Sequence, residues 1–218
     1  MKLKALLILS IITFSLTART LRIKIGSSER DANVYSNGQL IGSGTVEILL
    51  LPNRSATVEI KKVGYLTETL EMFNDGTHIR PKKEYFFTMR KDDSLDASTA
   101  TDQANVDIEI KTSKKEDEAW RLISEIITSN FDIIETSDKS TGYMRTAWAV
   151  QPFTQNTVRT RIVIKSGGTS PLKYKIKLIS ESSGKPLTSV KNDELFQQWD
   201  RVLRKYEYLI SELQSRLK

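Results

Sequence analysis

Residues 31–65 read Asp-Ala-Asn-Val-Tyr-Ser-Asn-Gly-Gln-Leu-Ile-Gly from 31 to 42, Thr-Val-Glu-Ile-Leu-Leu-Leu-Pro from 45 to 52, and Thr-Val-Glu-Ile-Lys-Lys-Val-Gly-Tyr from 57 to 65. The pair Asn37-Gly38 predicts a hairpin turn, because both residue types accept the positive φ of a two-residue turn. Val58 and Ile60 alternate with charged residues, which indicates a half-buried antiparallel strand. This stretch therefore predicts short strands joined by tight turns.

The flanking segments continue the same pattern. Residues 21–25 place three apolar side chains on one face and two cations on the other, and Lys-Glu-Tyr-Phe-Phe-Thr-Met at 83–89 closes the region. Turns rich in Gly and Asn separate the strands. Short strands separated by such turns at regular intervals along the chain predict a small all-β sandwich over residues 19–91.

Four features of this region resemble the PEGA domain, a small all-β module of microbial surface and envelope proteins. They are Val-Tyr-Ser-Asn-Gly at 34–38, Ile-Gly at 41–42, Leu-Pro at 51–52 and Lys-Val-Gly-Tyr at 62–65. The resemblance spans about residues 20–90. It implies an architecture and a place in the cell envelope, and no particular activity.

Residues 1–18 have the pattern of a secretory signal peptide. Lys2 and Lys4 precede an uncharged run from Ala5 to Ala18 that ends in small residues. The run is too short to cross a bilayer of about 30 Å, which needs about 20 residues. We therefore expect an exported protein, periplasmic or associated with the cell surface, with no transmembrane segment after cleavage.

The composition limits the chemistry of the exported chain. The 218 residues include no Cys, which excludes disulfides and thiolate metal sites and leaves no attachment point for a lipid anchor. Removal of Lys2 and Lys4 lowers the formal charge from +6 to +4. A charge of this size does not by itself indicate a polyanion partner.

A change of composition divides the chain near its middle. The stretch from Lys91 reads Lys-Asp-Asp-Ser-Leu-Asp-Ala-Ser-Thr-Ala-Thr-Asp-Gln-Ala-Asn, which is acidic, rich in hydroxyls and poor in apolar side chains. Such compositions are typical of exposed linkers, and the spacing of a calcium loop is missing. We predict a linker at 92–105 between two domains, 19–91 and 106–218.

The second domain has mixed periodicity. Residues 106–110 predict a strand, Ser113-x-x-Glu116 predicts a capping box that starts a helix, and four strands follow at 131–135, 143–150, 157–165 and 172–179. A long helix from about Asp193 is expected to carry an apolar stripe, formed by Leu195, Trp199, Val202, Leu203, Tyr206, Ile210, Leu213 and Leu217. The order β-α-β-β-β-β-α predicts an α+β domain in which two helices pack on an antiparallel sheet.

This order resembles the helix-grip domains of BamC-type outer-membrane assembly lipoproteins. The shared motif is Glu-Ala-Trp-Arg-Leu-Ile at 118–123 followed by Phe-Asp-Ile-Ile-Glu-Thr-Ser-Asp-Lys-Ser-Thr-Gly-Tyr-Met-Arg-Thr at 131–146. In those domains a helix precedes a strand, an acidic turn ending in Gly, and a second strand. The resemblance covers about residues 106–217 and implies a role in envelope assembly, although the lipidated Cys of that family is missing.

Residues that carry catalytic chemistry are scarce. His78 is the only His, so Cys-His dyads and multi-His metal sites are excluded, and its place in Asn-Asp-Gly-Thr-His-Ile predicts a solvated turn residue. The 27 acidic residues leave carboxylate-pair hydrolysis as an alternative, but most fall on polar faces, caps and the linker. We expect a protein that is not an enzyme, with no catalytic residues, no metal and no cofactor.

One candidate for binding is the loop that contains Asp138, Lys139 and Gly142. It is either a binding loop or a connecting turn, in which Asp138 caps backbone amides and Gly142 takes a positive φ.

The other candidate is a row of cations on two consecutive strands. Each cation alternates with an apolar residue, so pairing of the strands would place all six on one face. Like charges opposite one another are destabilising, so the face is either well solvated or neutralised by an anionic partner. The six residues are Arg159, Arg161, Lys165, Lys173, Lys175 and Lys177.

These observations favour a non-enzymatic envelope binding or scaffold protein, such as one that assists envelope or outer-membrane assembly, with an envelope protein or an anionic envelope polymer as partner. One alternative is a polyanion- or glycan-binding protein that uses the basic sheet face. A hydrolase with carboxylate chemistry is the other. Nucleic acid is not expected, because export argues against it and stacking aromatics are not expected on that face.

We predict that the mature protein begins at Arg19, because a charged start and a short apolar run lead to a small residue at Ala18. Mass spectrometry of the protein from its native host measures this directly. A mature chain that still begins at Met1 would contradict export by this signal.

Overall fold

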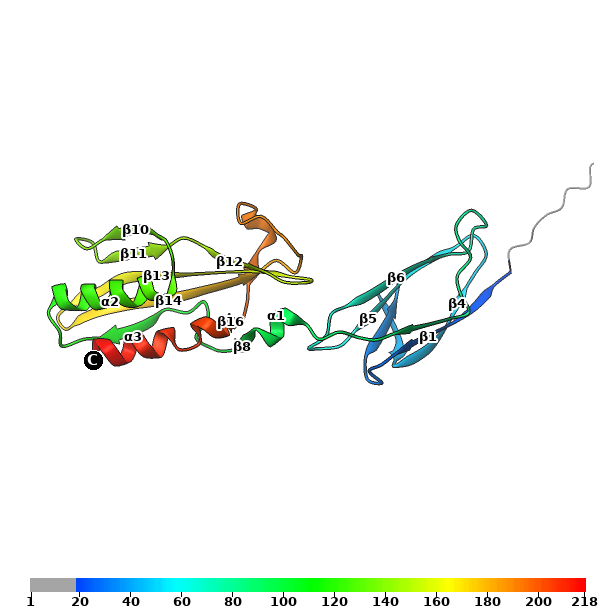
Figure 1. The fold of residues 1–218 in the computed structure, drawn as a ribbon, viewed down its shortest axis with the longest axis horizontal. Coiled ribbons are helices and arrows are strands. Elements are labelled where there is room, and N and C mark those ends of the chain that lie inside the picture. The colour runs from blue at the N-terminus through cyan, green and yellow to red at the C-terminus, as the bar shows by residue number, and fades with distance from the viewer. Residues whose placement is uncertain (1–18) are drawn as a thin grey trace, which may run out of the picture. The chain divides into compact units, whose positions relative to one another are not determined.

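The computed structural model describes residues 19–218, and the predicted signal peptide lies outside them. The chain divides into two compact units with the boundary between Arg90 and Lys91, and each unit is described by itself. Strands predominate in both, and helices occur only in the second among the described residues (Figure 1).

The first unit consists of two β-sheets. A three-stranded sheet has the order β4-β1-β7 and a four-stranded sheet has the order β3-β2-β5-β6. The strands are β1 (Leu21–Ser27), β2 (Asn33–Ser36), β3 (Gln39–Ser43), β4 (Thr45–Leu50), β5 (Ser55–Lys61), β6 (Glu68–Phe73) and β7 (Glu84–Phe87). Most neighbours are antiparallel, but β7 pairs with β1 in parallel, which the sequence pattern did not indicate.

One apolar cluster holds these two sheets together. Ile23 and Ile25 of β1 are buried in the same cluster as Val58 and Ile60 of β5. The predicted inward faces of both strands are thus confirmed. The Asn37-Gly38 turn is also confirmed: it joins β2 to β3 with φ values of 49° and 80°, the two positive values that this turn type requires.

The second unit is built around a seven-stranded sheet. Its main order is β10-β11-β13-β14-β15, with β12 also pairing with β13 and β9 with β14. The sheet strands are β9 (Ile108–Lys111), β10 (Ile134–Asp138), β11 (Tyr143–Thr146), β12 (Ala149–Pro152), β13 (Thr157–Thr169), β14 (Leu172–Ser182) and β15 (Gln197–Gln198). The remaining elements are α1 (Asp93–Asp96), β8 (Ser98–Ala100), α2 (Glu116–Asn130), η1 (Asp193–Leu195), β16 (Arg201–Leu203), η2 (Arg204–Tyr206) and α3 (Leu209–Leu217).

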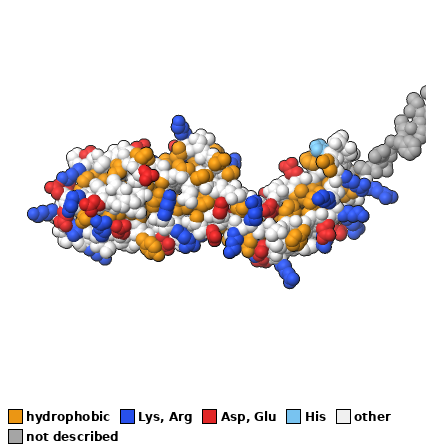
Figure 2. Space-filling view, in the orientation of Figure 1, with side chains coloured by type: hydrophobic (Ala, Val, Ile, Leu, Met, Phe, Trp, Pro, Cys, Tyr) orange, Lys and Arg blue, Asp and Glu red, His pale blue; other side chains and the backbone are white. Residues whose placement is uncertain are grey.

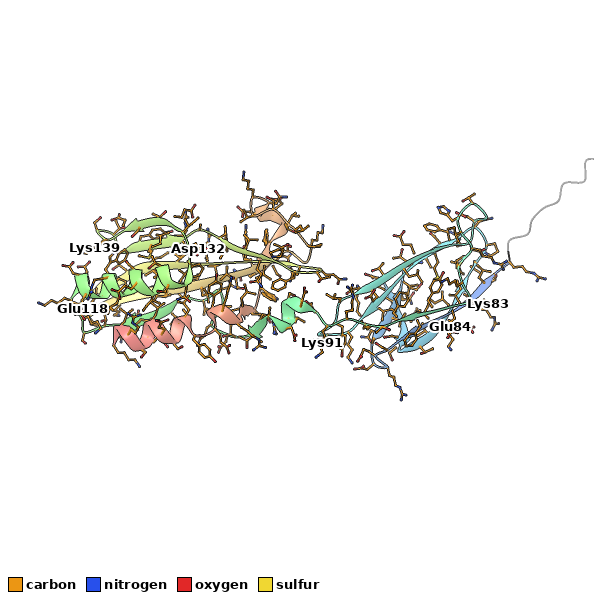
Figure 3. All side chains as sticks on the ribbon, viewed as in Figure 1. Lys83, Glu84, Lys91, Glu118, Asp132 and Lys139 are labelled. Atoms are coloured by element: carbon orange, nitrogen blue, oxygen red, sulfur yellow. The ribbon has the colours of Figure 1, made fainter. Side chains whose placement is uncertain are left out.

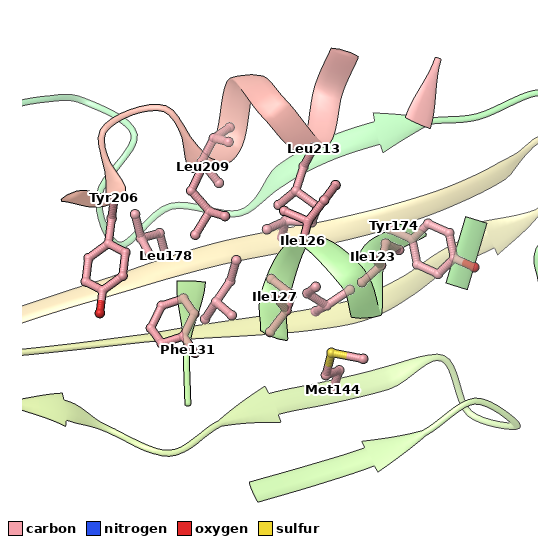
Figure 4. Close-up of a cluster of buried hydrophobic side chains, with 14 of the residues drawn as sticks. Ile123, Ile126, Ile127, Phe131, Met144, Tyr174, Leu178, Tyr206, Leu209 and Leu213 are labelled. Atoms are coloured by element: carbon pink, nitrogen blue, oxygen red, sulfur yellow. The ribbon is translucent and has the colours of Figure 1, made fainter. Parts of the chain in front are cut away.

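Helices α2 and α3 pack on one face of this sheet. Ile123 and Ile127 of α2 and Leu213 of α3 lie in one cluster with Ile162 of β13 and Ile176 of β14 (Figure 4). Each of these side chains is fully buried. Apolar residues spaced three and four apart on the helices therefore form one half of this core, and apolar residues spaced two apart on the strands form the other half.

Residues 92–105 do not form the predicted exposed linker. The segment contains α1 and β8, and β8 pairs with β16. Ser94 and Ser98 are buried, and the Asn105 side chain donates hydrogen bonds to the carbonyls of Ser180 (3.0 Å) and Trp199 (2.8 Å). The composition was misleading because this segment is held by hydrogen bonds to distant residues rather than by apolar side chains of its own.

The predicted long helix from Asp193 is also wrong, since the helix starts at Leu209. Residues 197–198 pair with β14 and residues 201–203 pair with β8, so their backbone hydrogen bonds go to other strands. Val202, Tyr206 and Leu213 still reach one core, but from a strand, a 3₁₀ turn and a helix. Near α2 the predicted capping box is absent: the N-cap residue is Lys115, without a side-chain cap bond.

None of the helices in residues 19–218 has the length and apolar character needed to cross a bilayer.

Leu213→Ala should destabilise the second unit by about 2–5 kcal/mol, because it leaves a cavity between α3 and α2. All three Trp residues of the chain, Trp120, Trp148 and Trp199, lie in this unit. Urea unfolding followed by Trp fluorescence therefore reports on it alone.

Leu195→Ala is the matched control, because Leu195 is 36 % exposed and surface changes usually stay within about 0.5 kcal/mol. Equal unfolding midpoints for the two variants would contradict the assigned core.

Candidate binding face of the second unit

The sheet face opposite α2 and α3 carries a group of cations around Val163. Arg145 of β11 and Lys177 of β14 lie directly opposite Val163 on the two neighbouring strands. Arg161 and Lys165 lie two residues before and after it on β13 and share its face. We call Arg145, Arg161, Lys165 and Lys177 the Val163 cluster.

Only half of the Val163 cluster is neutralised by carboxylates. Arg145 Nε lies 3.0 Å from a carboxylate oxygen of Glu135, and Lys177 Nζ lies 3.4 Å from Asp107. Arg161 and Lys165 have no ion-pair partner among residues 19–218. The cluster therefore holds an excess of positive charge within a few ångströms of a buried apolar residue.

Arg161 is the most constrained member. Its guanidinium carbon lies 4.0 Å from the centre of the Trp148 ring, its side chain is partly buried, and its Nε is buried without a hydrogen-bond partner in the described part of the chain. Burial and, next, the charge of Arg145 lower the pKa of Arg161. The Nε is out of reach of a ligand, but the less buried N–H groups of a guanidinium held in this way can donate hydrogen bonds to an anion.

Arg159 was predicted to lie on the exposed basic face, and this is wrong. It is 3 % exposed. Its Nε donates to Glu181 at 2.7 Å, its Nη1 lies 2.5 Å from Asp193, and its guanidinium carbon lies 4.1 Å from the Phe196 ring centre. The segment after β14 folds back over this end of the face, so Arg159 is a structural residue.

The two remaining predicted cations, Lys173 and Lys175, differ in whether they have an acidic partner. Lys173 Nζ lies 3.3 Å from Glu109 of β9, so it is neutralised. Lys165 and Lys175 lie directly opposite each other, both exposed, and neither has an ion pair within residues 19–218. The structure therefore keeps the row on one face but concentrates its excess charge at Arg161, Lys165 and Lys175.

Trp148 is a site residue that the sequence analysis missed. Residues 143–150 were expected to form one strand, but β11 ends at Thr146 and β12 begins at Ala149. Trp148 lies at this break, and its ring lies 4.0–4.2 Å from the guanidinium carbons of Arg161 and Arg159. The expectation that this face lacks aromatic side chains was thus wrong. The sequence feature that could have revealed the error is the position of Trp148, two residues before Val150. Val150 lies opposite Arg159 in the sheet.

The loop with Asp138, Lys139 and Gly142 is a turn held by its own hydrogen bonds; Lys139 is labelled in Figure 3. The Asp138 carboxylate accepts hydrogen bonds from the hydroxyls of Ser140 (2.6 Å) and Thr141 (2.8 Å), which lower the pKa of Asp138. Lys139 pairs with Asp117 of α2. Gly142 has a φ of 63°, and an added Cβ would lie 2.7 Å from Ser166 Cβ. These groups are occupied by internal contacts, so the turn interpretation explains them.

His78 lies in an exposed turn of the first unit. Its ring stacks on Phe73 with a centroid distance of 4.2 Å, and its Nδ1 lies 2.8 Å from Asp75. In residues 19–218 no group of three or more His, Asp or Glu side chains is placed to hold a metal ion.

No protein-family model matches the chain, and a search of curated sequences produced no significant match. The likeness of the two halves to PEGA and BamC-type domains stays a prediction from motifs.

Arg159→Gln should destabilise the second unit by about 3 kcal/mol or more, because Glu181 would keep its partly buried charge without a partner. Arg161→Gln is the matched control: it lies on the same strand and touches the same ring, and its loss should cost no more than about 1 kcal/mol because it removes like-charge repulsion. Urea unfolding followed by Trp fluorescence compares them. Equal stability of the two variants would show that Arg159 is not structural.

Proposed function

We propose that this chain is an exported, non-enzymatic cell-envelope protein that binds an anionic envelope component through the Val163 cluster. The observation that carries the proposal is Arg161, a partly buried guanidinium held against Trp148 with no ion-pair partner in the described residues.

The surroundings of Arg161 favour a ligand over simple solvation. A solvated surface Arg would turn its head group into water, whereas Arg161 is fixed beside two other arginines, Arg145 and Arg159. Arg145 and Arg159 already have carboxylate partners, so an anion at Arg161 would supply the partner that Arg161 lacks among the described residues. Guanidinium groups match carboxylates and phosphates through paired N–H donors, so the ligand should present one of these groups.

The exposed pair Lys165 and Lys175 extends the same charge along the face. A single small anion would contact the Arg161 end only. A component with several negative charges, such as an anionic envelope polymer or an acidic segment of an envelope protein, would contact both ends. This is the polyanion alternative from the sequence analysis, applied to a smaller set of residues.

We further propose that the two units are independent domains, PEGA-like and helix-grip-like, and that the protein acts in the periplasm or at the cell surface as a binding or scaffold component of envelope assembly. Support comes from the signal-like N-terminus, the quoted motifs and the separate apolar clusters of the two units. Absence of a lipid-accepting Cys argues against lipid anchoring.

The double variant Arg161→Gln, Lys165→Gln should lose the partner while the protein stays folded. Residues 19–218 are used as bait in an envelope extract, and bound components are identified at increasing salt. Binding by the unchanged chain should fall as salt rises, because exposed charges act over about 8 Å at physiological ionic strength. The variant should recover the partner at least about tenfold less.

Lys185→Gln, Lys191→Gln is the control, since both lysines are exposed in the same unit and lie outside the Val163 cluster. If both double variants capture the same components at the same salt, the cluster is only a solvated face and the proposal fails.

A further inference from the structure

We propose that the end of the first unit where the described chain begins binds the surface of a bilayer that contains anionic lipids. This inference uses other residues, in the other unit. Its argument from the position of this end in the chain rests on the export that is part of the proposed function, whereas the vesicle test below does not depend on the Val163 cluster.

Three segments distant in sequence meet at this end. The Asn74 side chain donates hydrogen bonds to the carbonyls of Arg19 (2.9 Å) and Leu50 (3.1 Å), and the amide of Lys24 donates to the carbonyl of Lys83 (2.9 Å). Residues 20–23 and 80–83 then line one open hollow. The loops at 51–54 and 74–83 therefore flank the first described residues.

This end carries an excess of unpaired cations. Lys and Arg side chains project around it in Figure 2, and Figure 3 labels Lys83 there. Five cations have no ion-pair partner among residues 19–218; they are Arg19, Arg54, Arg80, Lys82 and Lys83. The nearby Arg22 forms only an exposed pair with Glu47 at 3.4 Å.

The acids at this end do not cancel that charge. Glu84 pairs with Lys24 at 2.8 Å. The Asp75 carboxylate accepts hydrogen bonds from the amides of Thr77 and His78, which lower its pKa. Asp75 is thus the one negative charge of the 74–83 loop, and it is turned toward its own backbone.

Exposed aliphatic side chains lie among these cations. Ile79, directly before Arg80, is 95 % exposed, and Leu51, directly after Leu50, is 54 % exposed. A soluble polyanion gains nothing from contact with them. A bilayer binds both kinds of side chain, because basic residues interact with anionic headgroups while apolar residues enter the interface.

The position of this end in the chain favours the same partner. Arg19 directly follows the apolar run from Ala5 to Ala18, which is expected to enter the membrane during export. The cations and Ile79 would then face the bilayer from the first moment that this unit folds.

Co-sedimentation with vesicles tests the proposal on residues 19–218, because no residue before Leu21 belongs to either apolar cluster of the described chain. Binding is expected to vesicles of phosphatidylcholine with about a third phosphatidylglycerol, and not to phosphatidylcholine alone. Arg80→Gln, Lys82→Gln, Lys83→Gln should weaken binding about fivefold per cation, hence about 100-fold. Ile79→Ser should weaken it about fivefold.

Two control variants test whether vesicle binding depends on this surface or on positive charge anywhere in the protein. Lys185→Gln, Lys191→Gln, Lys218→Gln removes as many exposed cations from the second unit and should keep the original affinity, as should Arg161→Gln, Lys165→Gln. The proposal is overturned if the 80–83 variant binds like the unchanged chain, or if the Lys185 control loses as much. It is also overturned if Ile79→Ser has no effect, since the surface would then be a general polyanion site.

Discussion

Alternation along the β13–β14 hairpin is the constraint on which the second unit depends. Neighbouring residues of a strand must point to opposite faces, so the eleven-residue β14 and thirteen-residue β13 separate apolar and charged side chains over their length. One face receives Ile162, Ile164 and Ile176, and α2 and α3 cover it. The other face receives the cations. The core and the candidate binding face therefore follow from the same alternation. A shift of either strand by one residue would move its apolar side chains to the charged face and its charged side chains into the core.

The cations on the open face have three kinds of environment along the strands. At one end Arg159 is enclosed by Glu181, Asp193 and aromatic rings. Beside β9, Lys173 is paired with Glu109 of that strand and Lys177 with Asp107, the residue directly before it. Between these regions Arg161 and Lys165 stay unpaired in the described chain. Burial of a charge is costly unless partners are supplied, so the sequence supplies them where Arg159 is enclosed and omits them where the face is open.

The periodicity of the sequence predicted the strands well but predicted the segments that connect them poorly. The inward faces of β1, β5, β13 and β14 followed from alternation, because that signal is local to each strand. The ordered segment at 93–105 and the stretch at 193–208, which does not form the predicted α-helix, depend on hydrogen bonds to distant strands, which no local pattern reveals. For the candidate site, the shared face of the cations was predictable. The burial of Arg159 and the place of Trp148 were not, because both depend on the chain returning over the sheet after Ser182 and breaking at Ala147.

The pairing of β8 with β16 has a consequence for when the second unit folds. Arg201 Nε donates to Ser98 Oγ at 2.8 Å, and Asn105 bonds to Ser180 and Trp199, so several contacts of the first residues of the unit are made with residues near the end of the chain. Contacts of such high sequence separation form late and slowly. Until residues 180–201 have been synthesised, Ser98 and Asn105 lack these partners. The first unit also joins distant residues, in the pairing of β1 with β7, but all of its strands lie within residues 21–87. Its pairing partners are therefore complete long before those of the second unit, which allows it to fold first.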